Sequence, residues 1–269
     1  PVVTQLILPL RASPLRKRVA NMVKLREYRT LLPFTVEEYR IGQLYLTAKS
    51  STNYSKPGEG VEVVINEPFD NERGKGQYTK KIMHLAELIP GWVRYLFSSL
   101  NSLAVVEESW NQYPDCYTEY TCEYFGKKFK IEVNTKHVDG DYGKIENIHN
   151  LSKEDLKKRK VDYIDIVNDE VPADKYKKEE DPKLFKSQTK NIGPLDKEWV
   201  KNTKPMMCAY KIVRAEFAVP LIASKLENAI QDKGFREILL EVNRQAFCWM
   251  DEWIWMKIDD VRKFEGECA

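Results

Sequence analysis

The amino-acid sequence predicts an α+β fold, in which a β-rich body is joined to a long helix near the C-terminus. Three stretches, 115–125, 127–137 and 208–217, alternate between apolar and polar residues, which is the period of a strand. Between 222 and 256 the apolar residues recur instead at the spacing of one helix face. Residues 35–38 read Thr-Val-Glu-Glu, a capping-box pattern that predicts the start of a short helix.

The other elements follow from the same two periods and from turn residues. Strands are expected over the ranges 28–34, 43–49, 61–67, 77–84, 115–125, 127–137 and 208–217. Residues 88–112 are expected to form short helices and a loop, whereas YIDIV at 163–167 is typical of a strand. A second, shorter helix is expected over 258–265, and Gly234 is expected to interrupt or bend the long one. The lysine-rich stretch 174–190 is interpreted as a solvated surface loop.

Charge and composition limit the possible function classes. The chain has 269 residues, 42% of them apolar, and contains no apolar run near the roughly 18 to 20 residues of a membrane-spanning helix. Residues 1–21 carry four basic side chains and no acid, and from Met22 onward 39 basic face 41 acidic side chains. We therefore interpret 1–21 as a leader or vector-derived segment and 22–269 as a single domain. A near-neutral domain gives no reason to expect nucleic acid as a partner.

Cysteine and histidine usage argues against a metal site. The five cysteines are odd in number and widely spaced, with no Cys-x-x-Cys pair, and there are only three histidines. This spacing does not match zinc ligation, and reduced thiols in the cytosol are expected.

Polar residues occupy strand faces that are otherwise apolar. Thr118, Thr135 and Lys211 fall on such faces, and one of the adjacent Lys80 and Lys81 must do so as well. Taken singly, an inward threonine binds backbone and an inward lysine extends its ammonium group to the rim. Taken together, they predict a cavity that is mainly apolar and carries a few polar groups at one end, because a buried lysine needs an anion. A phosphate attached to hydrocarbon chains suits such a lining.

Ten ordered motifs support a more specific prediction. They are EYR.LLP (27–33), EYRIGQLY (38–45), GEGVEV (58–63), NEP (66–68), GKGQYT.KI (74–82), WN.YP (110–114), EEDPK.FKS (179–187), MCAYK (207–211), FCW.D.W (247–253) and DD.R (259–262). With these motifs, the chain from Met22 to about Glu265 resembles the class I phosphatidylinositol transfer proteins of the cytosol.

The resemblance implies a helix-grip (START-like) fold, in which a concave antiparallel sheet and long helices enclose one phospholipid. It implies an inositol site at Thr79, Lys81, Asn111 and Glu265 and a phosphate site at Gln43, Thr118, Thr135 and Lys211, with Cys116 in the cavity near the headgroup. Lys81 would then point inward and Lys80 outward, with Glu265 as a counter-charge of Lys81.

The chain departs from the family pattern in two places. The membrane-inserting tryptophan pair of the family is replaced by Val219-Pro220, and the chain ends four residues after Glu265. We expect the following residues to contact membranes: Trp92, Tyr95, Leu96, Phe97, Val219 and Leu221. Trp253 and Trp255 suit an interfacial depth equally well as a place in the core. Ser187 matches a phosphorylation position of the family.

The resemblance implies a monomeric, cytoplasmic, peripheral membrane carrier without catalytic residues, metal or cofactor, whose cargo is phosphatidylinositol and a second phospholipid such as phosphatidylcholine. Two alternatives remain open at this point. One is an adaptor that presents its lipid to a lipid kinase. The other is a lipid hydrolase, which would need a nucleophile activated by a base that the histidines do not obviously supply.

Overall fold

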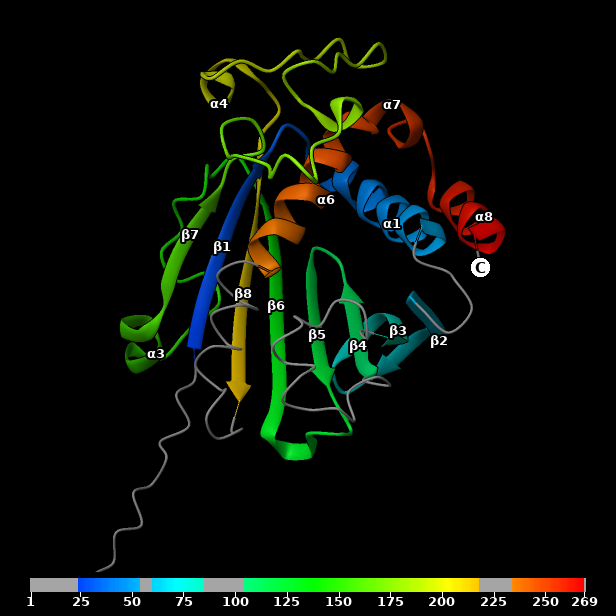
Figure 1. Cartoon of the computed structure of the whole chain (residues 1–269), viewed down its shortest axis with the longest axis vertical. Helices are drawn as coiled ribbons and strands as arrows, with labels where there is room; N and C mark the ends of the chain where they lie inside the picture. The colour runs from blue at the N-terminus through cyan, green and yellow to red at the C-terminus, as the bar shows by residue number, and fades with distance from the viewer. Residues whose placement is uncertain (1–23, 54–59, 85–103, 218–233, 269) are drawn as a thin grey trace, which may run out of the picture.

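The computed structural model describes residues 24–53, 60–84, 104–217 and 234–268 of the chain. They form one large sheet with most of the helices on one side and the short helix Lys153–Lys158 on the other, an α+β arrangement (Figure 1). The strands are β1 (Lys24–Leu32), β2 (Gly60–Asn71), β3 (Gly74–His84), β4 (Ala104–Gln112), β5 (Asp115–Thr121), β6 (Phe129–Asp139), β7 (Lys160–Ile164) and β8 (Met207–Phe217). Their order in the sheet is β2-β3-β4-β5-β6-β8-β1-β7, and all neighbours are antiparallel except the parallel pair β1 and β7.

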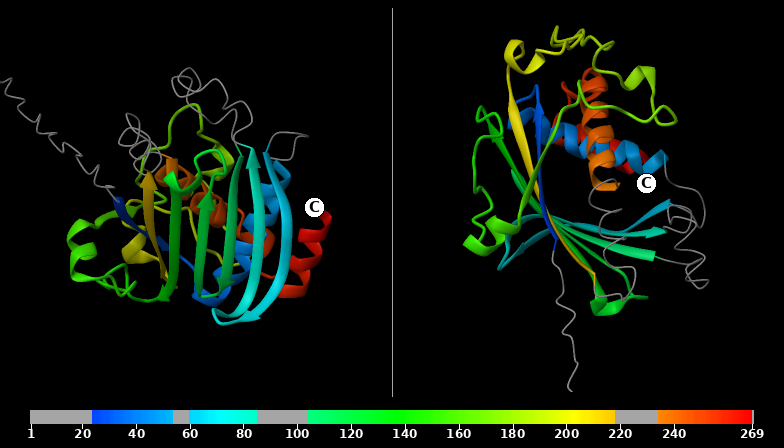
Figure 2. Two further views of the ribbon diagram at one scale, coloured as in Figure 1. Left: turned by 90° about the horizontal axis from the view of Figure 1, so that it is seen from below. Right: turned by 60° about the vertical axis from the view of Figure 1, so that its left-hand side comes forward.

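Helices cover one face of this sheet, which we call the inner face. The helices of the described chain are α1 (Val36–Asn53), α3 (Lys153–Lys158), α4 (Trp199–Asn202), α6 (Arg236–Cys248), α7 (Met250–Trp253) and α8 (Ile258–Cys268), with short 3₁₀ turns at η2 (Gly126–Lys128) and η3 (Lys178–Glu180). Figure 2 shows α1, α6 and α8 on the same side of the sheet. The inner face is therefore the one on which a ligand could be enclosed between sheet and helices.

Helix α1 begins as the sequence predicts. The backbone amide of Glu38 donates to Thr35 Oγ1 at 3.1 Å, and the amide of Thr35 donates to Glu38 Oε2 at 2.8 Å, which completes the capping box. The predicted strand over 43–49 is wrong, because these residues continue α1. Tyr39, Gly42 and Leu46 are buried at helical spacing, and this period over the longer segment outweighs the short alternation in QLYLT.

The prediction of helices and a loop over 88–112 is wrong in its second half, where 104–112 form β4. Three polar residues, Glu107, Ser109 and Asn111, stand on the inner face of this strand, so its alternation is hidden. The rest of the range lies outside the described residues. The other predicted strands are confirmed with shifted ends, and the helices over 236–248 and 258–268 fall within or near the predicted ranges.

The apolar core lies where α1, α6 and α7 meet one end of the sheet. Trp253 is fully buried, its indole N–H donates to the Ala246 carbonyl at 3.1 Å, and its ring meets that of Phe34 edge-on at 5.1 Å. A Cβ at Gly42 would stand 3.0 Å from the Trp253 ring, so a larger residue would have to displace the ring or α1 by a few tenths of an ångström. Trp253 is thus a core residue, whereas Trp255 is 62% exposed.

A second apolar cluster occupies the inner face further along β6 and β8. It includes Phe129, Ile131, Val133, Val213 and Ala215, all buried, and Leu240 of α6 packs with them. These residues alternate along their strands as predicted. The inner face therefore changes along the sheet from this apolar region to the polar residues of β3, β4 and β5.

Candidate functional site

A cavity of about 600 Å³ lies between the inner face and helices α1 and α8. This volume falls within the range of small-molecule sites, about 300–1,000 Å³. Six of the residues predicted from the sequence line it, namely Gln43, Thr79, Lys81, Asn111, Cys116 and Glu265. Strand β2 supplies much of the remaining wall, from Val61 to Asn66.

Strand register explains why residues distant in sequence meet here. Alternation places every second residue of a strand on the inner face, and antiparallel pairing sets these residues side by side. One row across the sheet runs Thr79–Ser109–Thr118, the next runs Lys81–Glu107–Tyr120, and a third runs Asn111–Cys116–Thr135–Lys211. The predicted binding residues of β3 to β8 therefore form one continuous patch.

Three of the predicted phosphate ligands, Thr118, Thr135 and Lys211, lie together at one side of this patch, whereas Gln43 lines the cavity from α1. Lys211 Nζ donates to Thr135 Oγ1 at 3.0 Å, and the hydroxyl groups of Ser109 and Thr118 are hydrogen-bonded at 3.1 Å. Thr118, Thr135 and Lys211 lie beside the described cavity lining, which they reach through Ser109 and Cys116. Burial lowers the pKa of Lys211, and the nearby Cys116 and Glu107 act against this effect. Hydroxyl and ammonium donors so arranged can bind one phosphate.

The structure pairs Lys81, a predicted inositol ligand, with a different acid from the one expected. The sequence favours Glu265 as the counter-charge of Lys81, but the structure places Glu107 there, with 3.5 Å between Lys81 Nζ and Glu107 Oε1. Both side chains are mostly buried, at 15% and 16% exposure. Glu265 instead accepts from Arg262 Nη1 at 2.6 Å within α8. Lys81 points into the cavity as predicted.

Glu107 and Ser109 are the cavity residues that the sequence interpretation misses. A signal for them is present, since the WN.YP motif identifies Asn111 and a strand places residues 107, 109 and 111 on one face. The expectation of helices over this segment conceals it.

His137 lies beside the phosphate cluster as a neutral, enclosed ring. Its Nδ1 atom donates to the Pro114 carbonyl at 2.8 Å, and its ring packs against those of Tyr39 and Tyr113. Burial, followed by the charge of Lys211, lowers the pKa of His137 to about 4.

We expect acid to destabilise the fold through His137. The unfolded chain takes up a proton on this residue below about pH 6.5, whereas the folded protein does so only near pH 4, so stability is full above pH 6.5 and falls as the pH decreases through this window. The loss approaches about 3 kcal/mol at pH 4. Urea unfolding at pH 7 and 4.5 measures it. His137→Gln should reduce the pH dependence by this amount, with the contribution of His149, whose pKa burial also lowers to about 4, remaining, whereas the control His84→Gln should leave it unchanged. An unchanged slope in His137→Gln would contradict this assignment.

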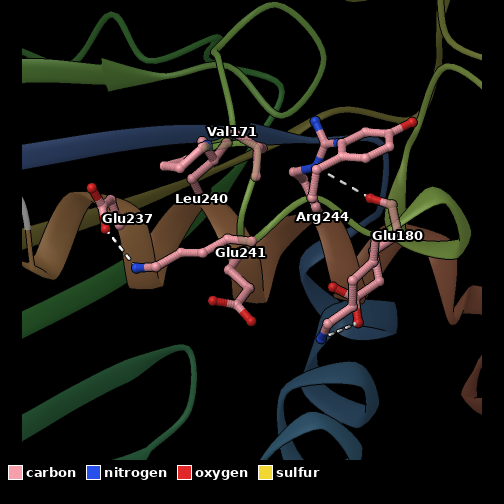
Figure 3. Close-up of a pocket in the computed structure, with 10 residues that line it drawn as sticks. Val171, Glu180, Glu237, Leu240, Glu241 and Arg244 are labelled. Atoms are coloured by element: carbon pink, nitrogen blue, oxygen red, sulfur yellow. Dashed lines mark hydrogen bonds and ion pairs between the residues drawn. The ribbon is translucent and has the colours of Figure 1, made fainter. Parts of the chain in front are cut away.

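A second hollow lies between the loop 171–181 and α6 (Figure 3). Its volume of about 30 Å³ matches that of one water molecule, too little for a lipid. Several charged groups around it are paired with one another, as in the ion pairs of Lys175 with Glu237 at 2.7 Å and of Lys177 with Glu180 at 3.1 Å. Arg244 joins this loop to α6 by donating to the Glu180 carbonyl at 3.1 Å. We interpret it as a structural junction.

Ser187 is fully buried, which bears on its predicted modification. Its hydroxyl donates to Asp251 Oδ1, and the same carboxylate accepts from the backbone amides of Gln188 and Thr189 at 2.8 and 3.2 Å. A kinase would reach this hydroxyl only after the loop had separated from α7.

Several predicted features fall outside the described residues. These are the segment 1–21 and the membrane contacts Trp92, Tyr95, Leu96, Phe97, Val219 and Leu221. Within the described ranges, no helix is long and apolar enough to cross a membrane, and no group of three His, Cys, Asp or Glu side chains is placed to hold a metal ion.

Comparison with known proteins agrees with the motifs. Residues 23–269 match the family model described as phosphatidylinositol transfer protein. The chain is 48% identical over 244 residues to phosphatidylinositol transfer protein 2 of Dictyostelium discoideum, covering 90% of this chain and 93% of the relative. It is 49% identical over 247 residues to cytoplasmic phosphatidylinositol transfer protein 1 of Drosophila melanogaster, covering 91% and 89%. A membrane-associated relative of Mus musculus shares 44% identity over 250 residues, 91% of this chain but 20% of that longer protein. The chain therefore belongs to the phosphatidylinositol transfer protein family.

Proposed function

We propose that this protein binds one phosphatidylinositol molecule in the cavity between the sheet and helices α1 and α8 and transfers it between membranes. The observation that carries the proposal is the polar patch at one end of the inner face, which combines Lys81 and Asn111 with the Lys211–Thr135 pair and adjoins an apolar region. The family membership of the chain supports the same function. In this proposal the sheet and helices take the helix-grip arrangement, and the protein acts in the cytoplasm and at membrane surfaces.

The headgroup would lie with its phosphate near Gln43, Thr118, Thr135 and Lys211 and its inositol ring near Thr79, Lys81, Asn111 and Glu265. A phosphate accepts hydrogen bonds from hydroxyl and ammonium donors, which the first set supplies. Inositol hydroxyl groups both donate and accept, and the second set offers both kinds of partner. Because the phosphate ligands would serve any phospholipid, phosphatidylcholine is our proposed second cargo.

The acyl chains account for the need for a carrier. Each CH₂ group exposed to water costs about 0.8 kcal/mol, so two chains cost on the order of 20 kcal/mol if fully hydrated. In this proposal the acyl chains contact the apolar side chains of β6 and β8, which here pack with Leu240 of α6, so loading separates α6 from them. Transfer then requires no covalent step, only opening and closing of the cavity at a membrane.

Replacing Lys81 tests the placement of the ring. Lys81→Ala should lower transfer of phosphatidylinositol between protein-free vesicles about tenfold or more, since a charged hydrogen bond contributes about 1.5–3 kcal/mol. Transfer of phosphatidylcholine should change much less. Lys80→Ala is the matched control, because its side chain projects from the opposite face of the same strand. Equal loss for both lipids would show that Lys81 serves folding or closure instead, and absence of phosphatidylinositol in lipid extracted from the wild-type protein would refute the proposed cargo.

A further inference from the structure

On the inner face, Glu107 of β4 lies between the strand that carries Lys81 and the strand that carries Lys211. On β4 it pairs directly with Lys81 of β3 and with Tyr120 of β5. Its carboxylate lies 3.5 Å from Lys81 Nζ, and both side chains are mostly buried. Its charge also reaches Lys211, whose pKa is lowered by burial and raised by Cys116 and Glu107. Burial and the contact with Glu107 likewise raise the pKa of Tyr120.

The charges of the cavity differ between its two ends. Near the proposed ring position, Lys81 is paired with Glu107, and Arg262 is paired with Glu265 at 2.6 Å. The remaining acid of the lining, Glu62, is 65% exposed and therefore largely screened by water. Among the described residues, each charged side chain near the ring position other than Glu62 therefore has a partner of opposite charge.

The phosphate end carries an unbalanced positive charge. Lys211 donates to the neutral hydroxyl of Thr135, and in the described part of the chain no carboxylate lies within 4.0 Å of its ammonium group. A phosphodiester brings one negative charge to this end. The two ends together therefore suit a headgroup with one negative charge and an uncharged ring.

We propose that Glu107 is a specificity-determining residue that restricts the cavity to inositol headgroups without ring phosphates. A phosphate group on the ring would place roughly two negative charges near the Glu107 carboxylate, which is already ion-paired with Lys81. Lys81 cannot compensate fully, because its charge is shared with Glu107. Repulsion between like charges in a partly buried site is far stronger than in bulk water. The inference rests on the proposed placement of the inositol ring beside Lys81.

Substitution of Glu107 by glutamine tests this inference, since it removes the charge and keeps the shape. Four proteins, the wild type, Glu107→Gln, the double variant Lys81→Gln/Glu107→Gln and Glu108→Gln, are incubated with phosphatidylcholine vesicles. The vesicles contain equal amounts of phosphatidylinositol and phosphatidylinositol 4-phosphate. Lipid extracted from the re-isolated protein is quantified by mass spectrometry, and the readout is the ratio of the phosphorylated to the unphosphorylated inositol lipid.

We expect this ratio to rise about tenfold or more in Glu107→Gln, because Lys81 is then unpaired and the ring end gains one positive charge. The double variant restores neutrality and should return the ratio toward the wild-type value. Glu108→Gln is the matched control, because Glu108 is the next residue of β4, lies on the outer face and accepts from the Tyr78 hydroxyl at 2.6 Å. Its ratio should equal that of the wild type.

An unchanged ratio in Glu107→Gln, in a protein that carries phosphatidylinositol, would overturn the inference and leave the proposed function intact. The same holds if the double variant keeps the elevated ratio, since the effect would then not depend on charge balance. A wild-type protein that takes up no phosphatidylinositol would instead refute the proposed function. Thermal unfolding of each variant verifies the fold, and Glu107→Asn, for which the same rise is expected, replaces Glu107→Gln if that variant does not fold.

Discussion

Replacing Lys211 by methionine is expected to abolish loading with every phospholipid and to stabilise the lipid-free protein. Lys211 is partly buried, burial lowers the pKa of its ammonium group, and in the described chain its one hydrogen bond is to Thr135 at 3.0 Å. A phosphate would supply the missing negative charge, and loss of one partner of a buried ion pair costs about 3–5 kcal/mol, a hundredfold or more in affinity. Without lipid, the same charge is uncompensated, so methionine should raise the free energy of unfolding by about 1–4 kcal/mol.

Two measurements on Lys211→Met separate these effects. Extracted phosphatidylinositol and phosphatidylcholine should both fall below about one hundredth of their wild-type amounts, whereas urea unfolding of delipidated protein should show a higher midpoint. Lys136→Met is the control, since Lys136 lies on the opposite face of β6 from Thr135 and binds Asp115 at 2.6 Å. Normal loading of Lys211→Met would remove this residue from the phosphate site. Loss of lipid together with loss of stability would show that Lys211 acts as a structural residue.

Replacing Glu27 by glutamine is expected to destabilise the protein by about 3–5 kcal/mol. Glu27 is fully buried and bridges two arginines, with 2.7 Å to Arg29 Nε and 2.9 Å to Arg159 Nη1. Arg29 is 1% exposed and also donates to the Gly143 carbonyl at 2.7 Å, so it cannot turn toward water. Glutamine would leave the buried guanidinium group of Arg29 without a counter-charge and leave Arg159 with the exposed carboxylate of Glu146, 3.5 Å away. Because domains of this kind are stable by about 5–15 kcal/mol, this loss is a large fraction of the total.

Urea unfolding at neutral pH measures the effect of Glu27→Gln. The control is Glu154→Gln, which breaks the pair of Glu154 with Lys158 on the surface of α3, where the carboxylate is 77% exposed. Such a pair contributes about 0.5 kcal/mol or less. A similar decrease in the free energy of unfolding in both variants would show that burial does not make the Glu27 ion pairs more stabilising than a surface pair.

The sequence predicts those parts of the fold that depend on local pattern. The inner face of β6 is buried from Phe129 to His137 at every second residue, as alternation predicts. The capping box at Thr35 also forms. Two segments escape correct prediction, because a short alternation lies inside a helix at 43–49 and because polar cavity residues disguise a strand at 104–112.

Partners across the sheet are beyond what local pattern can determine. Whether Lys81 meets Glu107 or Glu265 depends on the register between β3 and β4, which the alternation within either strand does not specify. The motifs identify Asn111, but its neighbours Ser109 and Glu107 require the assignment of β4 as a strand. The placement of the predicted binding residues on one patch becomes visible only with the order of all eight strands.

The close approach of Gly42 to the Trp253 ring has a consequence for how cargo leaves. Gly42 is the immediate neighbour of Gln43, which lines the cavity, so this part of the cavity wall is joined directly to the buried core around Trp253. We expect this wall to keep its position when a lipid enters or leaves. We therefore expect the lipid to leave through another side of the cavity. A bulkier residue at position 42 should displace Gln43 before it weakens the packing of α1.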